Sequence, residues 1–557
     1  MDTQRLILFV LFSFSSLMLW ENWQKENRPK PVATTQGPTS GSVPGPAAKA
    51  ADPSLPKPAS GATAGAATVP ATPAESAAGR TKLTVETDVM NVDIDTRGGD
   101  IVRVELPKHK DPEDTTKTFV FMSPEHKYTA QSGFADDALP NHTTIYKAAG
   151  STYRLADGQN DLEVKLEAEL ANGVRGVKTL RFTRGSYVIE VGHRIYNGTA
   201  AAIQPSAYFH LTRDGRPPPG DSAMMSTYSG PAVYTATGFY QKLAWSDIDK
   251  DKLPFPKTPQ TEGWVAMVQH YFVAAWLPAP KLVREFYADK SADGAYRAGF
   301  KTPLGTIAPG ASATVVSPLY VGPQEQSTLR ALAPGLDVVV DYGWLKLFAE
   351  PLFWVLQWFY NLTNNWGWAI VLLTLSIKIL FYPLSAASYR SMAKMKLVTP
   401  RLTKLREQYG DDRVKLNQAM MELYKTEKIN PVGGCLPIAI QIPVFIALYW
   451  VLLGAVELRQ APWLGWIKDL SIPDPWYILP VLMLISMVVQ TKMNPTPPDP
   501  VQAKVMMAMP FVFGIMFFWF PAGLVLYWFV NNLLSIAQQW QITRMFTSGA
   551  EKKPAKG

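Results

Sequence analysis

The sequence predicts a polytopic α-helical membrane protein with six spans and one large all-β domain outside the membrane. Three observations predict this fold class. Apolar residues gather near the N-terminus and in several runs after Asp341 of the 557-residue chain, as membrane spans require. The region between them carries β-type residues and turn signals without a long helical period. Lys and Arg concentrate in one short loop, which orients the chain in the membrane.

The N-terminal region predicts an anchor followed by a tether. Residues 6–20 form an uncharged apolar run behind Arg5, and no small-residue cleavage site follows it. We therefore expect residues 1–28 to be a retained membrane anchor rather than a cleaved signal peptide. Residues 29–80 are rich in Pro, Ala, Gly, Ser and Thr and contain no aromatic residue. Such a segment cannot bury enough apolar surface to fold, so we interpret it as a flexible tether.

The sequence changes character over residues 81–340. The segments LTVETDV, LEVKLEAEL and SYVIEVGHRIY carry residues typical of β-strands, partly in alternation. Turn signals separate the strand-like segments at Gly98-Gly99, Asp157-Gly158, Asn172-Gly173 and Asn197-Gly198. This pattern predicts a large antiparallel β-sandwich.

The C-terminal part predicts helices on and in the membrane. Residues 341–361 mix aromatic and apolar residues with Lys346 and Glu350, which is typical of an amphipathic helix lying in the interface. Residues 362–545 form the membrane core, and its apolar runs are 366–384, 435–453, 476–490 and 505–537. The last run is too long for one crossing, and Pro521-Ala522-Gly523 splits it into a hairpin. With the N-terminal anchor, these runs make six spans.

Basic residues orient these spans. Residues 388–430 contain ten Lys or Arg and five Asp or Glu, so this loop is predicted to be cytoplasmic. Six spans then place both termini, including the basic tail 546–557, in the cytoplasm and the β domain in the periplasm. Apolar residues recur in the loop at steps of three and four, which predicts a helical hairpin. Its methionines either pack between the two helices or form an adaptable binding surface.

Lys378 is the most informative residue of the membrane core. A lysine at the bilayer centre costs roughly 2.5–3.5 kcal/mol, so it either reaches the cytoplasmic headgroups or lies in a wet cavity. Thr374 precedes it by one turn on the same helix face. Further polar side chains fall in other spans: Gln441, Ser486, Gln490, Asn531 and Asn532. Because each needs a partner or water in lipid, we predict a polar groove, although any one of them alone fits a bond between packed helices.

Four stretches carry a resemblance to a known family: NPVGGCLPIAIQIPVFIALYW, ELRQAPW, DPWYILP and WFPAGLVLYWFVNN. They resemble the YidC family of membrane protein insertases, over roughly residues 341–545. The resemblance implies a protein without covalent catalysis or a cofactor. Such a protein inserts nascent inner-membrane proteins and helps them fold, alone or beside the Sec translocon, through a hydrophilic groove with one positive charge. The implied partners are these substrates, Sec components, the ribosome and membrane lipids, with no nucleic-acid binding beyond ribosome contact.

The same resemblance implies roles for individual residues. Lys378 matches the family's groove charge, where arginine is familiar; lysine keeps the charge but lacks the rigid bidentate fork. The substrate-contacting positions match Thr374, Phe445, Met483 and Trp528, and Trp528 replaces a familiar tyrosine. The periplasmic domain resembles a β-supersandwich related to sugar-binding folds.

Two other classes of function compete with an insertase. One is a membrane-tethered periplasmic carbohydrate-binding or epimerase-like protein, with Glu190, His193 and His210 as acid and base. The other is a small-solute transporter, which the lack of an internal repeat disfavours. The sequence contains no Walker A loop and no dinucleotide-binding glycine fingerprint, so we expect no nucleotide cofactor. The single cysteine, Cys435, excludes an intramolecular disulfide.

Overall fold

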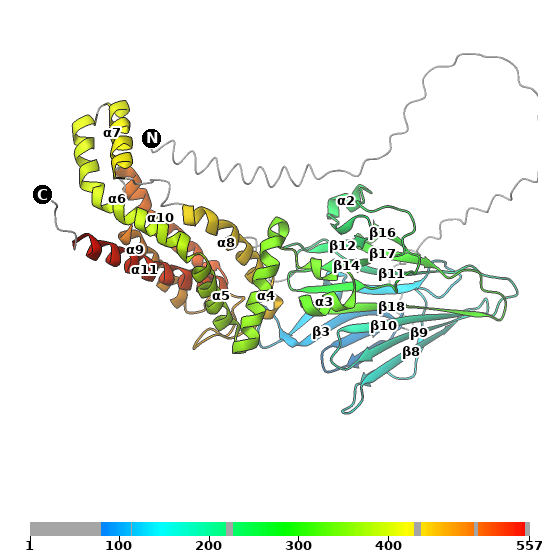
Figure 1. Cartoon of the computed structure of the whole chain (residues 1–557). Coiled ribbons are helices and arrows are strands. Elements are labelled where there is room, and N and C mark those ends of the chain that lie inside the picture. The colour runs from blue at the N-terminus through cyan, green and yellow to red at the C-terminus, as the bar shows by residue number, and fades with distance from the viewer. Residues whose placement is uncertain are drawn as a thin grey trace, which may run out of the picture. The chain divides into compact units, whose positions relative to one another are not determined.

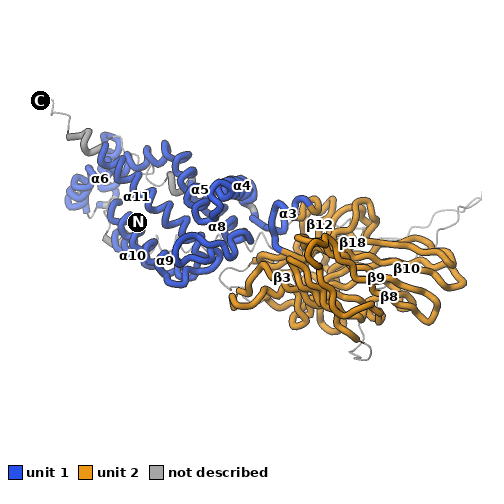
Figure 2. The backbone as a smooth tube through the Cα atoms, turned by 90° about the horizontal axis from the view of Figure 1, so that it is seen from below, with its two compact units in different colours: residues 1–10, 323–331, 337–557 blue, residues 11–322, 332–336 orange. Residues whose placement is uncertain are grey.

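The chain divides into two compact units, a β-sandwich and a helical unit (Figure 2). A computed structural model describes residues 80–112, 114–218, 227–410, 412–427, 436–494 and 500–551. The predicted anchor, the predicted tether up to residue 79 and the last six residues of the predicted tail lie outside the described residues.

The β unit contains two nine-stranded sheets (Figure 1). The first sheet is ordered β16 (Glu285–Lys290), β17 (Tyr296–Pro303), β11 (Ser206–Arg213), β5 (Thr129–Phe134), β3 (Asp100–Lys110), β2 (Asn91–Asp95), β1 (Lys82–Glu86) and β7 (Thr152–Arg154), with β4 (Thr118–Met122) beside β3. The second is ordered β13 (Phe239–Lys242), β12 (Gly230–Thr235), β14 (Trp264–Val268), β15 (Phe272–Trp276), β18 (Ser312–Pro323), β10 (Val188–Asn197), β9 (Val174–Thr183), β8 (Asp161–Glu169) and β6 (Lys147–Ala148). The prediction of a large β-sandwich is confirmed.

The strands form where the sequence alternates. In β8, Val164, Leu166 and Ala168 are buried, whereas the residues between them are exposed. The turn from β2 to β3 uses Gly98 and Gly99, whose φ angles of +75° and +61° are the left-handed conformation that glycine adopts without strain.

Aromatic side chains from both sheets meet in one core. Phe209 on β11 stacks on Phe300 of β17, with ring centroids 5.2 Å apart. Phe209 also meets Trp276 of β15 edge-on, with ring centroids 5.1 Å apart, and this contact joins the first sheet to the second. Each of these buried rings contributes about 1.5–3 kcal/mol by leaving water, so the sandwich has a large apolar driving force.

Arg284, directly before β16, organises the loops at one end of this sandwich. It is fully buried, and its guanidinium donates hydrogen bonds only to backbone carbonyl groups among the described residues. The acceptors and distances are Leu282 at 2.9 Å, Gly263 at 2.7 Å, Pro278 at 3.4 Å, Thr261 at 2.8 Å and Ala279 at 2.7 Å. One side chain therefore satisfies the carbonyls of two loops that form no regular sheet.

We expect Arg284→Lys to destabilise the β unit by about 2–3 kcal/mol, because lysine keeps the charge but cannot supply five fixed donors. Pulse proteolysis of the detergent-solubilised full chain in urea measures this as a lower midpoint for the β-unit fragment. Arg194→Lys is the matched control, since Arg194 is exposed on β10. Equal stability of the two variants would contradict this role for Arg284.

The second unit is helical. Its helices are α4 (Lys346–Thr363), α5 (Trp366–Leu380), α6 (Tyr382–Tyr409), α7 (Arg413–Thr426), α8 (Leu436–Gly454), α9 (Ile478–Met493), α10 (Pro500–Met516) and α11 (Ala522–Glu551), after a short α3 (Gln326–Leu332). The long helix α11 packs against α5, α6, α8 and α9. By length and hydropathy, no individual helix among the described residues qualifies as a membrane span, whereas α5 and α6 together do as a pair bent by 67°.

Two of the predicted apolar runs do not form one continuous helix each. The run 366–384 is interrupted, because α5 ends at Leu380 and the chain bends before α6. Pro383 at the start of α6 explains the break, since proline has no N–H group for the carbonyl of Ile379 and its ring clashes with that carbonyl in a continuous helix. The run 505–537 breaks before α11 at Pro521, where the sequence predicted the split.

Helix α4 agrees with the predicted amphipathic segment but begins five residues later, at Lys346. Ala349, Phe353 and Leu356 are buried against the helical unit. A second apolar set on α4 is exposed, comprising Leu347, Trp354, Trp358 and Leu362. This uncovered set is typical of a helix that lies against lipid.

Helices α6 and α7 pack against each other as a hairpin (Figure 1). Val398 and Leu402 of α6 are buried there, and Met395, Met420 and Leu423 pack against them. Met395 and Met420 therefore pack between the two helices, which is one of the two alternatives that the sequence left open for the hairpin methionines.

Candidate functional site

Lys378 lies in the last turn of α5, and its side chain is buried, with 5% exposed. Its Nζ donates a hydrogen bond to Ser535 Oγ of α11 at 2.7 Å. Among the described residues, no carboxylate forms an ion pair with it. The lysine thus brings a positive charge between helices and meets a neutral acceptor there.

Helix α11 presents a polar stripe to its neighbours. Asn531, Ser535 and Gln539 recur every four residues and therefore share one face, and Asn532 lies beside them. Each of the four hydrogen-bonds a different partner across the unit. The bonds run from Lys378 of α5 to Ser535 at 2.7 Å, from Gln441 of α8 to Asn531 at 3.0 Å, from Asn532 to Ser486 of α9 at 2.8 Å, and from Gln539 to Asn494 after α9 at 3.1 Å.

The predicted aromatic contacts lie farther along the same helix. Phe445 of α8 stacks on Trp528 with ring centroids 4.7 Å apart. Trp528 precedes Ser535 by seven residues, which is two helical turns or about 10 Å. Both residues are on the face of α11 that carries the polar stripe.

Thr374 and Met483 are buried but bond only locally. Thr374 Oγ1 donates to the carbonyl of Ile370 in its own helix at 2.7 Å. The carbonyl of Met483 accepts a bond from Ser486 Oγ, which connects it to the stripe through Asn532. Gln441, Phe445, Met483 and Trp528 thus gather with Lys378 along α11, while Thr374 lies one turn from Lys378 on α5.

Sequence reasoning missed three members of this set: Ser535, Gln539 and Asn494. Ser535 and Gln539 carried a detectable signal, because they continue the four-residue spacing from Asn531. Asn494 had none, since it follows α9 and only the packing of α11 brings it near Gln539.

The competing acid–base site does not assemble in the β unit. Glu190 is exposed on β10, whereas His193 is buried between the sheets and bonded to Ser132 Oγ at 2.9 Å. His210 bonds Gln131, the neighbour of Ser132 on β5, at 2.9 Å. Neighbouring strand residues point to opposite faces, so the two histidines lie on opposite sides of the first sheet. Burial holds the pKa of both well below the usual value, so they remain neutral.

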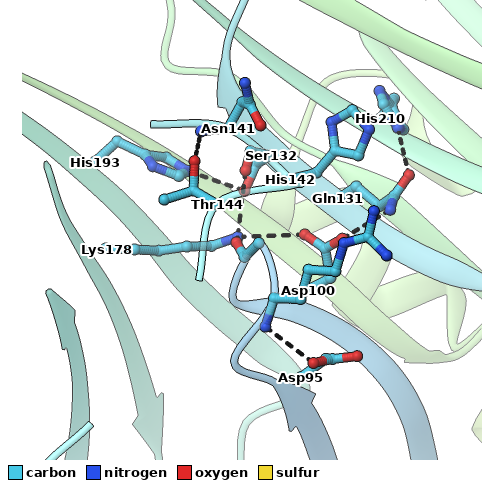
Figure 3. A network of polar contacts seen from close by, with 12 residues as sticks. Asp95, Asp100, Gln131, Ser132, Asn141, His142, Thr144, Lys178, His193 and His210 are labelled. Atoms are coloured by element: carbon cyan, nitrogen blue, oxygen red, sulfur yellow. Dashed lines mark hydrogen bonds and ion pairs between the residues drawn. The ribbon is translucent and has the colours of Figure 1, made fainter. Parts of the chain in front are cut away.

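His193 belongs to a buried polar network around Lys178 (Figure 3). Lys178 points inward from β9 and donates to the carbonyls of Gly98 at 3.0 Å and Ser132 at 3.4 Å. Its Nζ lies 3.8 Å from Asp100 Oδ1, and Gln131 donates to the other carboxylate oxygen at 2.7 Å. Burial raises the pKa of Asp100 and lowers that of Lys178. The network joins the two sheets through Lys178, so its role is structural.

Sequence comparisons define the class of this protein. Residues 82–355 match the family model of the YidC periplasmic domain, and residues 358–550 match that of the 60Kd inner membrane protein. The chain is 54% identical to a membrane protein insertase YidC of Dechloromonas aromatica (strain RCB), over 99% of both chains. A bacterial inner-membrane protein with a periplasmic β-sandwich and this relationship is a membrane protein insertase, not an enzyme. The chain belongs to the YidC family.

Two solved structures are also similar. One is described as an active YidC insertase with its first transmembrane domain resolved; it is 19% identical with a TM-score of 0.38, covering 84% of this chain and 93% of that chain. The other is a galactose mutarotase related enzyme from Lactobacillus acidophilus, 9% identical with a TM-score of 0.30, covering 43% of this chain and 97% of that chain.

We expect Lys178→Met to destabilise the β unit in a pH-dependent way. Without the cation, the pKa of Asp100 rises further, so the folded state prefers the protonated carboxyl and loses stability as pH rises. The loss relative to the native chain should be about 3–5 kcal/mol at pH 8 and smaller at pH 5.

Urea titration with pulse proteolysis of the full chain at both pH values measures this loss. The control is Lys165→Met, because Lys165 is exposed on β8 and pairs only with Glu163 at the surface among the described residues. A loss independent of pH would show that Lys178 acts by packing alone.

Proposed function

We propose that substrates pass along the polar stripe of α11, and that Lys378 attracts acidic residues in their translocated tails. The observation that carries this proposal is a buried cation whose hydrogen-bond partner is a neutral hydroxyl group. An ammonium has three donors, and a substrate carboxylate suits those that Ser535 does not take. The proposed contacts along the path are Lys378, Thr374, Gln441, Phe445, Met483 and Trp528.

The expected strength of this attraction is moderate. At ~4 Å and an effective dielectric near 20, two opposite charges attract by about 4 kcal/mol. Desolvation of both charges removes most of this energy. A net gain of about 1–2 kcal/mol, roughly a tenfold preference, is what we expect for an acidic tail.

We further infer six spans, with residues 388–430 and both termini in the cytoplasm, from the distribution of Lys and Arg. Residues 1–28 then anchor the chain and residues 29–80 tether the periplasmic domain. Helix α9 has 16 residues, about 24 Å, against a hydrocarbon core of about 30 Å. Such a short helix favours local thinning of the bilayer, which lowers the barrier for a polar tail.

Nascent inner-membrane proteins are the substrates of an insertase, and we propose three further kinds of partner for this chain. The Sec translocon would deliver some substrates, the ribosome would contact the basic cytoplasmic loop, and lipids would contact the exposed apolar set of α4. The charge of the loop supports the ribosome contact, and the uncovered apolar residues support the lipid contact.

Cysteine labelling tests the orientation. In a Cys435→Ser background, a membrane-impermeant maleimide applied to intact cells with a permeable outer membrane should label Asn160→Cys and spare Lys404→Cys. Both native residues are exposed, so access depends on the side of the membrane. After the inner membrane is opened, both positions should react. Labelling of position 404 but not 160 in intact cells would overturn the topology.

Substitutions at Lys378 test the attraction. Lys378→Ala should slow the insertion of a substrate with an acidic tail by about tenfold and spare one with a neutral tail. Lys378→Arg should be nearly silent because the charge remains, and Lys378→Glu should be worse than alanine because it repels the tail. The measurement is protease protection of two model substrates that differ only in tail charge. Equal impairment of both substrates by Lys378→Ala would assign the lysine a structural or hydrating role.

A further inference from the structure

Ser535 is the one described residue that accepts a hydrogen bond from the Lys378 ammonium. It is 4% exposed and lies on α11, 157 residues away along the chain. We propose that Ser535 is a positioning residue that holds the Lys378 charge at the polar stripe, where an acidic tail can reach it. This inference rests on the proposed function of Lys378 and deepens it.

The hydrogen bond from Ser535 to its own helix explains why its hydroxyl group is an acceptor toward other side chains. Its hydroxyl has one proton, and Oγ donates that proton to the carbonyl of Asn531, one turn earlier, at 2.7 Å. Only lone pairs then remain for other partners. One receives Lys378, and Tyr389 of α6 hydrogen-bonds the same side chain. The helix backbone thus fixes Ser535 as an acceptor, which suits a cation and excludes donation to a substrate carboxylate.

The position of Lys378 makes such an acceptor necessary. Lysine is a flexible four-carbon chain with a compact charge, and it reaches toward headgroups when nothing holds it. Lys378 lies two residues before the end of α5, beside the 67° bend into α6. The distance from its side chain to the headgroups is therefore short. The bond to Ser535 instead directs the ammonium to α11. An arginine fork would fix its own geometry, whereas lysine needs this external acceptor.

The hydroxyl also leaves the charge available. Ser535 takes one of the three ammonium donors without neutralising the charge. A carboxylate at the same place would neutralise it and compete with the substrate. A neutral acceptor that is itself held by the backbone therefore meets both requirements: it orients the cation and preserves its attraction for an acidic tail.

The test compares insertion rates of two substrates, one with an acidic and one with a neutral translocated tail, in full-length protein reconstituted into vesicles. The ratio of the two rates is the acid preference. Ser535→Ala should lower this ratio by about threefold, because the acidic substrate loses more of its insertion rate than the neutral one. Ser535→Thr should restore it, because threonine keeps the hydroxyl and its bond to the preceding turn. The matched control is Ser376→Ala, which removes a hydroxyl bonded only to the Leu372 carbonyl in α5 among the described residues.

The Lys378→Ala variant separates this inference from the function on which it rests. If Lys378→Ala leaves the acid preference intact, the proposed function fails and the role of Ser535 fails with it. If Lys378→Ala lowers the preference but Ser535→Ala does not, only the positioning role is overturned. A rise in preference in Ser535→Ala, or an equal loss for both substrates, also overturns it. The double variant should equal Lys378→Ala, since a positioning residue has no effect without the charge that it positions.

Discussion

The helical unit is organised by one constraint: a charged side chain among apolar helices must meet a partner or water. Lys378 meets Ser535 across 157 residues of sequence, and this bond joins α5 to α11. Uncharged polar residues at neighbouring positions on α11 also form hydrogen bonds to other helices. Asn531 bonds α8 and Asn532 bonds α9, so the same stripe that receives the cation also holds the other helices. The polar side chains of the stripe are thus also the bonds between the helices.

The β unit shows what a purely structural buried cation looks like. Lys178 bonds two backbone carbonyls and faces Asp100, and Arg284 is surrounded by carbonyls. In both cases the donors bond groups within the domain, and these bonds join sheets or loops. Lys378 differs, because the structure gives its ammonium one neutral acceptor among the described residues. Lys178 and Arg284 thus spend their donors on holding a fold, whereas Lys378 makes one hydrogen bond to a described residue.

Several elements were predictable because their causes are local. The alternation in β8 and the glycines before β3 are properties of neighbouring residues, and both agree with the structure. Proline chemistry at Pro521 likewise marked the start of α11. The break after Leu380 was missed, although Pro383 signalled it, because the apolar run continues through the bend and concealed it. Hydropathy averages over a window and does not register a change of direction.

The sequence alone determined the two-part architecture and the family, and it singled out Lys378, since a lysine in an apolar run stands out without any partner in view. Only the tertiary structure decided what that lysine touches. A serine such as Ser535 is unremarkable in a helix, because its hydroxyl bonds its own backbone whether or not another helix is near. The same structure separated His193 from His210, which alternation places on opposite faces of one sheet. Partners between distant segments depend on how whole helices and sheets pack, and residue spacing does not encode that packing locally.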